Sequence, residues 1–200
     1  MRWDKLFDDL ESQLEREITA EEVDLEAEEE RLRLGRLSVR ERLLALHEAE
    51  GRDSAYAVTL TLATGVRHTV HPVTFGRDWF SADVVEEGGR RSQCIVPIAA
   101  VHGITLTAAQ VALSLRADDR ANGHPSLSSR LGLPFLLRDL CRRRRAVELA
   151  CVTGGLHGTI DRVGRDHLDL AVHERGIPRR DSAVSEYRLV PFAGVMLVRL

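Results

Sequence analysis

Histidine side chains are the first candidates for metal chemistry in this sequence, and four of them fall into two groups. His68 and His71 lie three residues apart in a segment that alternates apolar and polar residues, and His167 and His173 lie nearer the C-terminus. Side chains three apart on a β-strand point to opposite faces, so His68 and His71 cannot share an ion without a bulge. We therefore expect ordinary loop and strand histidines and no metal site.

The short motifs of common enzyme sites are missing from the sequence. Lys5 is the only lysine, and a P-loop needs a lysine after its glycines. No GxSxG, HExxH or GxGxxG pattern occurs. The three cysteines are odd in number and lack CxxC spacing, which is typical of buried thiols in a reducing cytoplasm; they are Cys94, Cys141 and Cys151. These features predict a non-catalytic cytoplasmic protein that needs no cofactor.

Arginine side chains remain as candidate binding groups. Four consecutive arginines end a predicted helix, where the helix dipole favours positive charge, and two Arg-Arg pairs lie in predicted hairpin tips. Pairing with carboxylates of the same chain is one interpretation, and contact with nucleic-acid phosphates is the other. The predicted nucleic-acid-binding residues are Arg90, Arg91, Arg142, Arg143, Arg144, Arg145, Arg179 and Arg180.

A Gly-Arg-Asp tripeptide occurs twice, 88 positions apart, in FGRDWF and in VGRDHL. Glycine adopts positive φ readily and aspartate bonds to neighbouring backbone N–H groups, so both sites are predicted to be tight turns. A ligand-facing role is the alternative. The repeated loop residues are Gly76, Arg77 and Asp78, and Gly164, Arg165 and Asp166.

Other segments repeat around these two turns. AVTLTLATG (57–65) parallels AVELACVTGG (146–155), and CIVPIAAVHGI (94–104) parallels RLVPFAGVMLV (188–198). Their period-two alternation is typical of half-buried strands. Each copy follows a predicted helix, at 37–50 and at 127–145, with Pro134 dividing the second or marking its first turn. The predicted core positions are Val58, Leu60, Val96 and Val101, matched by Val147, Leu149, Val190 and Val195.

Charge divides the chain into an acidic leader and a basic body. Residues 1–50 carry 16 acidic and eight basic side chains, whereas residues 51–200 carry 15 acidic and 20 basic ones. No apolar run is long enough to span a bilayer, so we expect no membrane contact. The predicted organisation is an acidic amphipathic helix (1–36), a helix with a first small barrel (37–104), a linker (105–126) and a helix with a second small barrel (127–200).

The second copy resembles the Sm-like fold of the Hfq and Sm/LSm proteins, in which a helix precedes a strongly bent five-stranded barrel. The resemblance covers about 75 residues, with Gly158 at the bend of the second strand and Val163–Asp166 at the following loop. Other SH3-like barrels, such as the C-terminal domain of ribosome-maturation factors, are similar too. The tandem arrangement also resembles a group of bacterial proteins. The chain lacks the loop Asn of Sm proteins and the Tyr-Lys-His stretch of Hfq.

These observations together predict an α+β, mainly β chain with two tandem five-stranded Sm-like or SH3-like barrels, each preceded by a helix, behind an acidic N-terminal helix. The resemblance implies binding of RNA or of a ribonucleoprotein through the arginine-bearing loops. The alternative is a protein-interaction or assembly module, in which the acidic helix binds a protein partner and the barrels form an oligomer, because barrels of this size have little room for a core.

Overall fold

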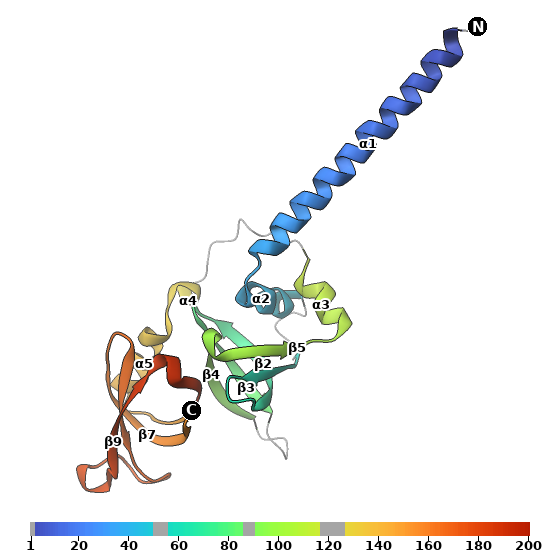
Figure 1. The fold of residues 1–200 in the computed structure, drawn as a ribbon. Helices are drawn as coiled ribbons and strands as arrows, with labels where there is room; N and C mark the ends of the chain where they lie inside the picture. The colour runs from blue at the N-terminus through green and yellow to red at the C-terminus, as the bar shows by residue number, and fades with distance from the viewer. Residues whose placement is uncertain (1–2, 50–55, 86–90, 117–126) are drawn as a thin grey trace. The chain divides into compact units, whose positions relative to one another are not determined.

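The computed structural model describes residues 3–49, 56–85, 91–116 and 127–200 (Figure 1). The chain divides into two compact units, Met1–Ser38 and Val39–Leu200. The first unit contains the single long helix α1 (Trp3–Arg36). Where side chains of α1 are described, nearly all are exposed, and ion pairs such as Arg33 with Glu30 (2.6 Å) run along the helix surface. No helix in the described ranges is both long and apolar enough to cross a membrane.

The second unit begins with a first half, residues 39–116, in which two helices accompany five strands. Its elements are α2 (Val39–Ala49), β1 (Val58–Leu62), β2 (Arg67–Phe75), β3 (Trp79–Val85), β4 (Arg91–Pro97), β5 (Val101–Thr105) and α3 (Ala108–Ser114). Pro97 ends β4 and leads into a single 3₁₀ turn before β5. The segment 105–126, expected as a linker, contains α3, whose first turn is fixed by a capping box between Thr107 and Gln110.

The second half, residues 127–200, has the same order of strands after its helices. Its elements are α4 (Leu127–Arg130), α5 (Leu133–Arg142), β6 (Ala146–Cys151), β7 (Gly154–Val163), β8 (His167–Val172), β9 (Glu186–Pro191) and β10 (Val195–Arg199). Pro134 lies in the first turn of α5, where its missing N–H costs nothing. The helical segment predicted at 127–145 is therefore divided just before this proline.

All ten strands join in one open antiparallel sheet with the order β5-β1-β2-β3-β4-β10-β6-β7-β8-β9. The prediction of two tandem five-stranded barrels, and of a mainly β chain, is wrong: the chain is mixed α+β with a single sheet. A separate barrel would require β4 to close against β5 of its own half. Instead β4 pairs with β10 of the other half, and each half contributes side chains to the hydrophobic cluster of the other.

The two halves nevertheless pair their strands in the same register. A β-bulge interrupts β2 between Pro72 and Thr74, and an equivalent one interrupts β7 between Ile160 and Arg162. Three cross-strand pairs of the first half have counterparts in the second. The pair Leu60–Ile104 corresponds to Leu149–Val198, Trp79–Pro97 corresponds to His167–Pro191, and Phe75–Phe80 corresponds to Val163–Leu168. The strand β9 therefore occupies the position of β4, and β5 the position of β10.

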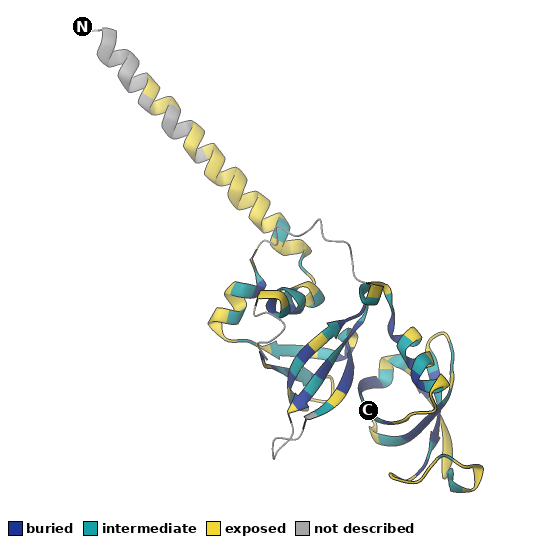
Figure 2. Ribbon diagram, turned by 180° about the vertical axis from the view of Figure 1, so that it is seen from behind, coloured by how far each residue is buried: buried dark blue, intermediate teal, exposed yellow. Residues whose placement is uncertain are grey.

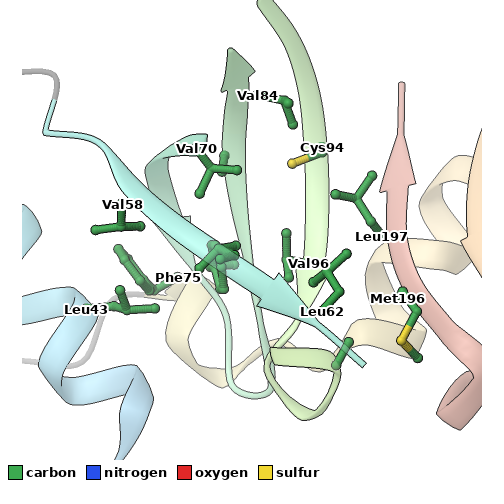
Figure 3. Close-up of a cluster of buried hydrophobic side chains, with 14 of the residues drawn as sticks. Leu43, Val58, Leu62, Val70, Phe75, Val84, Cys94, Val96, Met196 and Leu197 are labelled. Atoms are coloured by element: carbon green, nitrogen blue, oxygen red, sulfur yellow. The ribbon is translucent and has the colours of Figure 1, made fainter. Parts of the chain in front are cut away.

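Each half has its own hydrophobic cluster (Figure 2). Strands β1 and β6 alternate buried and partly buried residues around it, whereas β4 and β10 bury four consecutive residues each where the halves meet. The first cluster includes Leu43 of α2, Val58 of β1 and Val96 of β4, together with Met196 and Leu197 from β10 (Figure 3). The second cluster surrounds the strands that follow α5. Of the eight predicted core positions, seven are buried and Val101 is partly buried; the buried ones are Val58, Leu60, Val96, Val147, Leu149, Val190 and Val195.

Candidate functional site

The two halves meet at a contact that we call the joint, where β4 and the first Gly-Arg-Asp turn of the first half meet β10 and the start of α5. Ile95 pairs with Val198, Cys94 pairs with Arg199, and the Leu200 N–H donates to the Gln93 carbonyl at 3.0 Å. Side chains cross in both directions. Trp79 and Ile95 of the first half belong to the second cluster, whereas Met196 and Leu197 of β10 belong to the first.

The first Gly-Arg-Asp turn (residues 76–79) holds the chain that leads into α5. The Gly76 N–H donates to the Trp79 carbonyl at 2.8 Å, and the indole covers Gly76 so closely that no Cβ would fit there. Two donors of the turn bond to one carbonyl oxygen of the second half: the Arg77 N–H and the Trp79 Nε1 each lie 2.9 Å from the oxygen of Leu131. The turn is thus a structural contact and not a free loop.

Asp78 of the same turn caps helix α5. The N-cap residue of α5 is Gly132, which has no side chain to satisfy the first N–H groups of the helix. The Asp78 carboxylate replaces it, because Oδ1 accepts a hydrogen bond from the Leu133 N–H at 2.7 Å. A Cβ at Gly132 would lie 2.7 Å from Nη2 of Arg77, the end of an exposed side chain that can move aside, so packing does not require glycine there. One half therefore supplies the helix cap of the other.

The second Gly-Arg-Asp turn (residues 164–167) repeats this geometry without a helix docked on it in the described residues. The Gly164 N–H donates to the His167 carbonyl at 2.9 Å, and the imidazole covers Gly164 as the indole covers its counterpart. Arg165 is exposed, and the Asp166 side chain is 85% exposed. Asp166 bonds the His167 Nδ1 at 2.8 Å, which lowers the pKa of the carboxyl group.

An arginine from a helix of the same half braces each turn. Arg40 of α2 donates to the Gly76 carbonyl at 2.6 Å, and Arg138 of α5 donates to the Gly164 carbonyl at 3.2 Å. Both turns are consequently held in shape from inside their own half. Both segments form turns, but neither Gly76 nor Gly164 adopts the positive φ on which the prediction rested. Only the first turn has a partner segment among the described residues.

The run Arg142–Arg145 ends helix α5 and is largely engaged with the protein itself. Arg142 and Arg143 both bond Asp139, at 2.5 and 2.6 Å. The Arg145 N–H bonds the Leu140 carbonyl and the Arg144 N–H bonds the Cys141 carbonyl, a Schellman arrangement that places Arg144 at a φ of 52°. Glycine usually occupies that position, so an arginine there strains the backbone.

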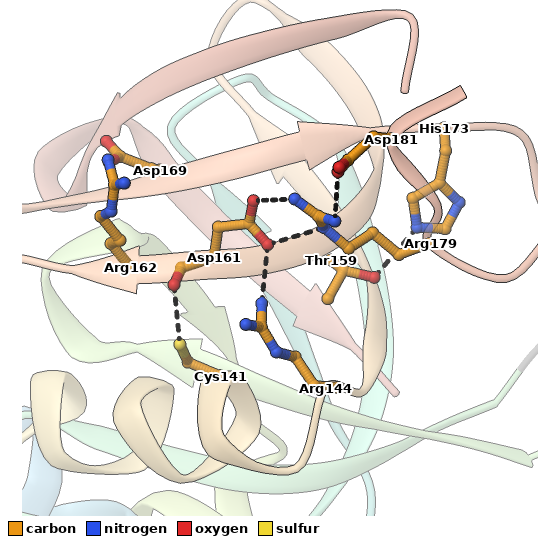
Figure 4. Close-up of polar contacts among 9 residues, drawn as sticks. All are labelled: Cys141, Arg144, Thr159, Asp161, Arg162, Asp169, His173, Arg179 and Asp181. Atoms are coloured by element: carbon orange, nitrogen blue, oxygen red, sulfur yellow. Dashed lines mark hydrogen bonds and ion pairs between the residues drawn. The ribbon is translucent and has the colours of Figure 1, made fainter. Parts of the chain in front are cut away.

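The Asp161 carboxylate accepts hydrogen bonds from Arg144 and from Arg179, one of the predicted hairpin-tip arginines (Figure 4). Arg179 binds it with two bonds, from Nε at 2.9 Å and from Nη2 at 2.7 Å, while Arg144 binds it at 2.8 Å. Arg179 also bonds Asp181 at 2.8 Å. The hydrogen bonds from Arg179 are the main reason why the pKa of Asp161 is lowered. Contact with the acidic leader is therefore not needed to neutralise these arginines.

The remaining candidate arginines are not brought together into one described site. Arg145 and Arg180 are exposed, and no ion pair involves their side chains within the described part of the chain. Arg90 lies outside the described residues, and Arg91 is described only as the first residue of β4. The predicted pair of matching Arg-Arg tips is accordingly observed only at Arg179 and Arg180.

The histidines lie apart and make local hydrogen bonds. The His71 Nδ1 lies 3.0 Å from the Tyr56 carbonyl, and His173 Nε2 lies 3.0 Å from the Thr159 hydroxyl. Burial lowers the pKa of His157, which packs edge-on against His173. Among residues 3–49, 56–85, 91–116 and 127–200, no group of His, Cys, Asp or Glu side chains could hold a metal ion. Burial also raises the pKa of the Cys94 thiol to about 12.

Sequence reasoning missed the most unusual surface, which is the outer edge of the sheet at β9. Leu189 and Tyr187 are 61% and 63% exposed, whereas Ile95, the counterpart of Leu189 in β4, is only 3% exposed. The alternating pattern of YRLVP resembles that of SQCIVP, so the pattern alone gives no signal that one strand is covered and the other open. Comparisons with protein-family models, with curated proteins and with solved structures found no match.

Proposed function

We propose that this chain is a non-catalytic protein-interaction module that binds another polypeptide by strand addition at β9. The observation that carries the proposal is the contrast between two equivalent side chains: Ile95 is buried by the pairing of β4 with β10, whereas Leu189 is 61% exposed on β9. Leu189 is an aliphatic residue of the kind that is usually buried, yet it lies at an edge of the sheet that no other described part of the chain covers.

The backbone of β9 supports the same function. Within the described residues β9 pairs only with β8 and forms one end of the sheet. Its outer N–H and C=O groups can pair with an added strand, and the apolar side chains beside them supply specificity. Leu189 and Tyr187 are two residues apart and so lie on one face of the strand. An incoming strand would cover both.

RNA binding through the arginine-bearing loops is the competing function, and the side-chain contacts favour it less. Of the six candidate arginines whose side chains are described, four already pair with Asp139, Asp161 or Asp181. A phosphate contact depends on the positive charge that an arginine offers, and a neighbouring carboxylate reduces it. RNA binding is therefore an outcome that the test must be able to detect.

The test is binding of a labelled peptide with the sequence of residues 191–200, which contains the strand that pairs with β4, to the full chain. We expect saturable binding in fluorescence anisotropy. Leu189→Lys should weaken it by about tenfold or more, because an unpaired ammonium at the interface costs over about 1.4 kcal/mol. Val66→Lys is the matched control, since Val66 is 50% exposed in the turn before β2, and it should leave binding unchanged.

Absence of saturable peptide binding, or equal binding by the Leu189→Lys variant, would contradict the proposal. The same proteins are titrated with a mixed-sequence single-stranded RNA at two salt concentrations. Tight, salt-sensitive RNA binding without peptide binding would replace the interaction module by the RNA-binding function.

A further inference from the structure

We infer that a buried pair of histidines, His157 and His173, makes the base of the β8–β9 hairpin open more readily in mild acid. His157 lies in β7, and His173 directly follows β8. The segment 173–185 connects β8 to β9, so its opening reaches the strand at which another polypeptide would bind. The hairpin responds to acid in the free chain, whether or not a polypeptide binds at β9.

The two imidazole rings are in contact, with their centroids 5.4 Å apart in an edge-to-face arrangement. The backbone joins the same two residues, since the His173 N–H donates to the His157 carbonyl at 3.2 Å. His173 is only 4% exposed, and both ring nitrogens of His157 are buried. The pair therefore closes the base of the hairpin against β7.

The two rings differ in their hydrogen bonds. The His173 Nδ1 lies 3.1 Å from the Glu174 carbonyl, to which it can only donate. In the neutral ring Nε2 then accepts from the Thr159 hydroxyl at 3.0 Å (Figure 4). Neither ring nitrogen of His157 has a hydrogen-bond partner within the described residues. Protonation would give this buried ring a charge and two N–H donors without acceptors, which is unfavourable.

The charged groups beside His157 come from β6, from the segment after β8 and from β10. Glu148 of β6 lies directly opposite His157 in the register of the strands. Its carboxylate already binds Arg175 and lies 3.7 Å from Arg199 of β10, so it is shared between two guanidinium groups. Burial, followed by the charges of His173 and Arg175, lowers the pKa of His157, whereas Glu148 acts to raise it.

The direction of the pH effect follows from this lowered pKa. In the open hairpin His157 is solvated and titrates near the ordinary histidine pKa of about 6.5. The closed hairpin disfavours the proton, so it is most stable above that pH and loses stability as the pH falls toward the lower folded pKa. At about pH 5.5 an ordinary histidine is protonated about ten to one, so the opening equilibrium rises by no more than about tenfold.

Amide hydrogen exchange of the full chain, followed by NMR at about pH 7.5 and about pH 5.5, tests the inference across the interval in which histidine changes charge. The reporters are the His173 N–H and the Ser185 N–H, which donates to the Val172 carbonyl at 2.9 Å. After correction for the intrinsic effect of pH on exchange, their protection should fall by about threefold to tenfold. The Leu200 N–H, which bonds the Gln93 carbonyl in the joint, should keep its protection.

The variant His157→Phe removes the titrating group, because a phenyl ring fills a similar volume and takes up no proton. Its hairpin amides should show the same protection at both pH values. His102→Phe is the matched control, since His102 is exposed on β5, and it should behave as the natural chain does. Unchanged protection in the natural chain, or an equal fall in the natural chain and in His157→Phe, would overturn the inference.

A second measurement uses the natural chain alone and does not depend on how the variant folds. In an NMR titration, the Cε1–H signal of His157 should change with a midpoint below the ordinary histidine value of about 6.5. A midpoint at or above that value would overturn the inference.

Discussion

Truncating the two equivalent side chains Ile95 and Leu189 to alanine should have very different effects on folding. Ile95 is 3% exposed and lies in the second cluster with Trp79 and Leu137. Removing its outer carbon atoms loses apolar burial and leaves a cavity, so Ile95→Ala should lower the free energy of unfolding by about 2–5 kcal/mol. Leu189 is 61% exposed, and Leu189→Ala should change that free energy by less than about 0.5 kcal/mol.

Urea unfolding at low protein concentration measures both values. Trp79 is buried in the joint, so its fluorescence reports separation of the two halves. Both variants should keep the dependence on urea of the natural chain, since they expose similar total surface on unfolding. A loss below about 0.5 kcal/mol for Ile95→Ala would mean that the joint is not a packed interface. Equal losses for both variants would refute the claim that only one of the two positions is covered.

Three further predictions concern the turns and the arginines. Asp78→Ala should lower the free energy of unfolding by about 0.5–2 kcal/mol through loss of the α5 cap, and Asp166→Ala should leave the urea midpoint unchanged; a reversed order would refute the difference between the turns. Arg144→Gly should be as stable as the natural chain or more stable. Glycine relieves the strain of the left-handed backbone, about 1–2 kcal/mol, which exceeds the stabilisation by an exposed ion pair. A clear loss of stability in thermal unfolding would contradict this. Because the pKa of Asp161 is lowered in the folded chain, its contribution to stability is present above about pH 4, where the unfolded carboxyl is ionised, and is lost as pH falls toward the folded pKa. In Asp161→Asn, the free energy of unfolding should therefore fall less steeply as the pH is lowered. An unchanged dependence on pH would argue against the pairing.

The strands and their buried faces could be predicted from the sequence because alternation is a local property. Leu60 and Leu149 follow the same pattern of apolar neighbours, and both are fully buried. How the edges pair is not local. Whether β4 meets β5 or β10 depends on contacts between residues about 100 positions apart, such as Ile95 with Val198, and no alternation encodes that choice.

Some of the arginine ion pairs could be predicted from the spacing of the residues in the sequence. Asp139 precedes Arg142 by three residues and Arg143 by four on one helix, which is the spacing of side-chain neighbours. Asp161 could not be found in this way, because it approaches Arg179 only when the chain returns after β8. The helix cap supplied by Asp78 was equally hidden, since it reaches α5 across 55 residues of chain.

Amide hydrogen exchange along β9 and β4, measured on the full chain with and without the peptide of residues 191–200, tests the central claim most directly. Amides around Ile95 should be protected with and without the peptide, because β10 covers them. Outward amides around Leu189 should exchange rapidly in the free chain, gain protection when the peptide is added, and lose that gain in Leu189→Lys. Rapid exchange along β9 with and without saturating peptide, with β4 protected throughout, would contradict the claim that this edge binds an added strand.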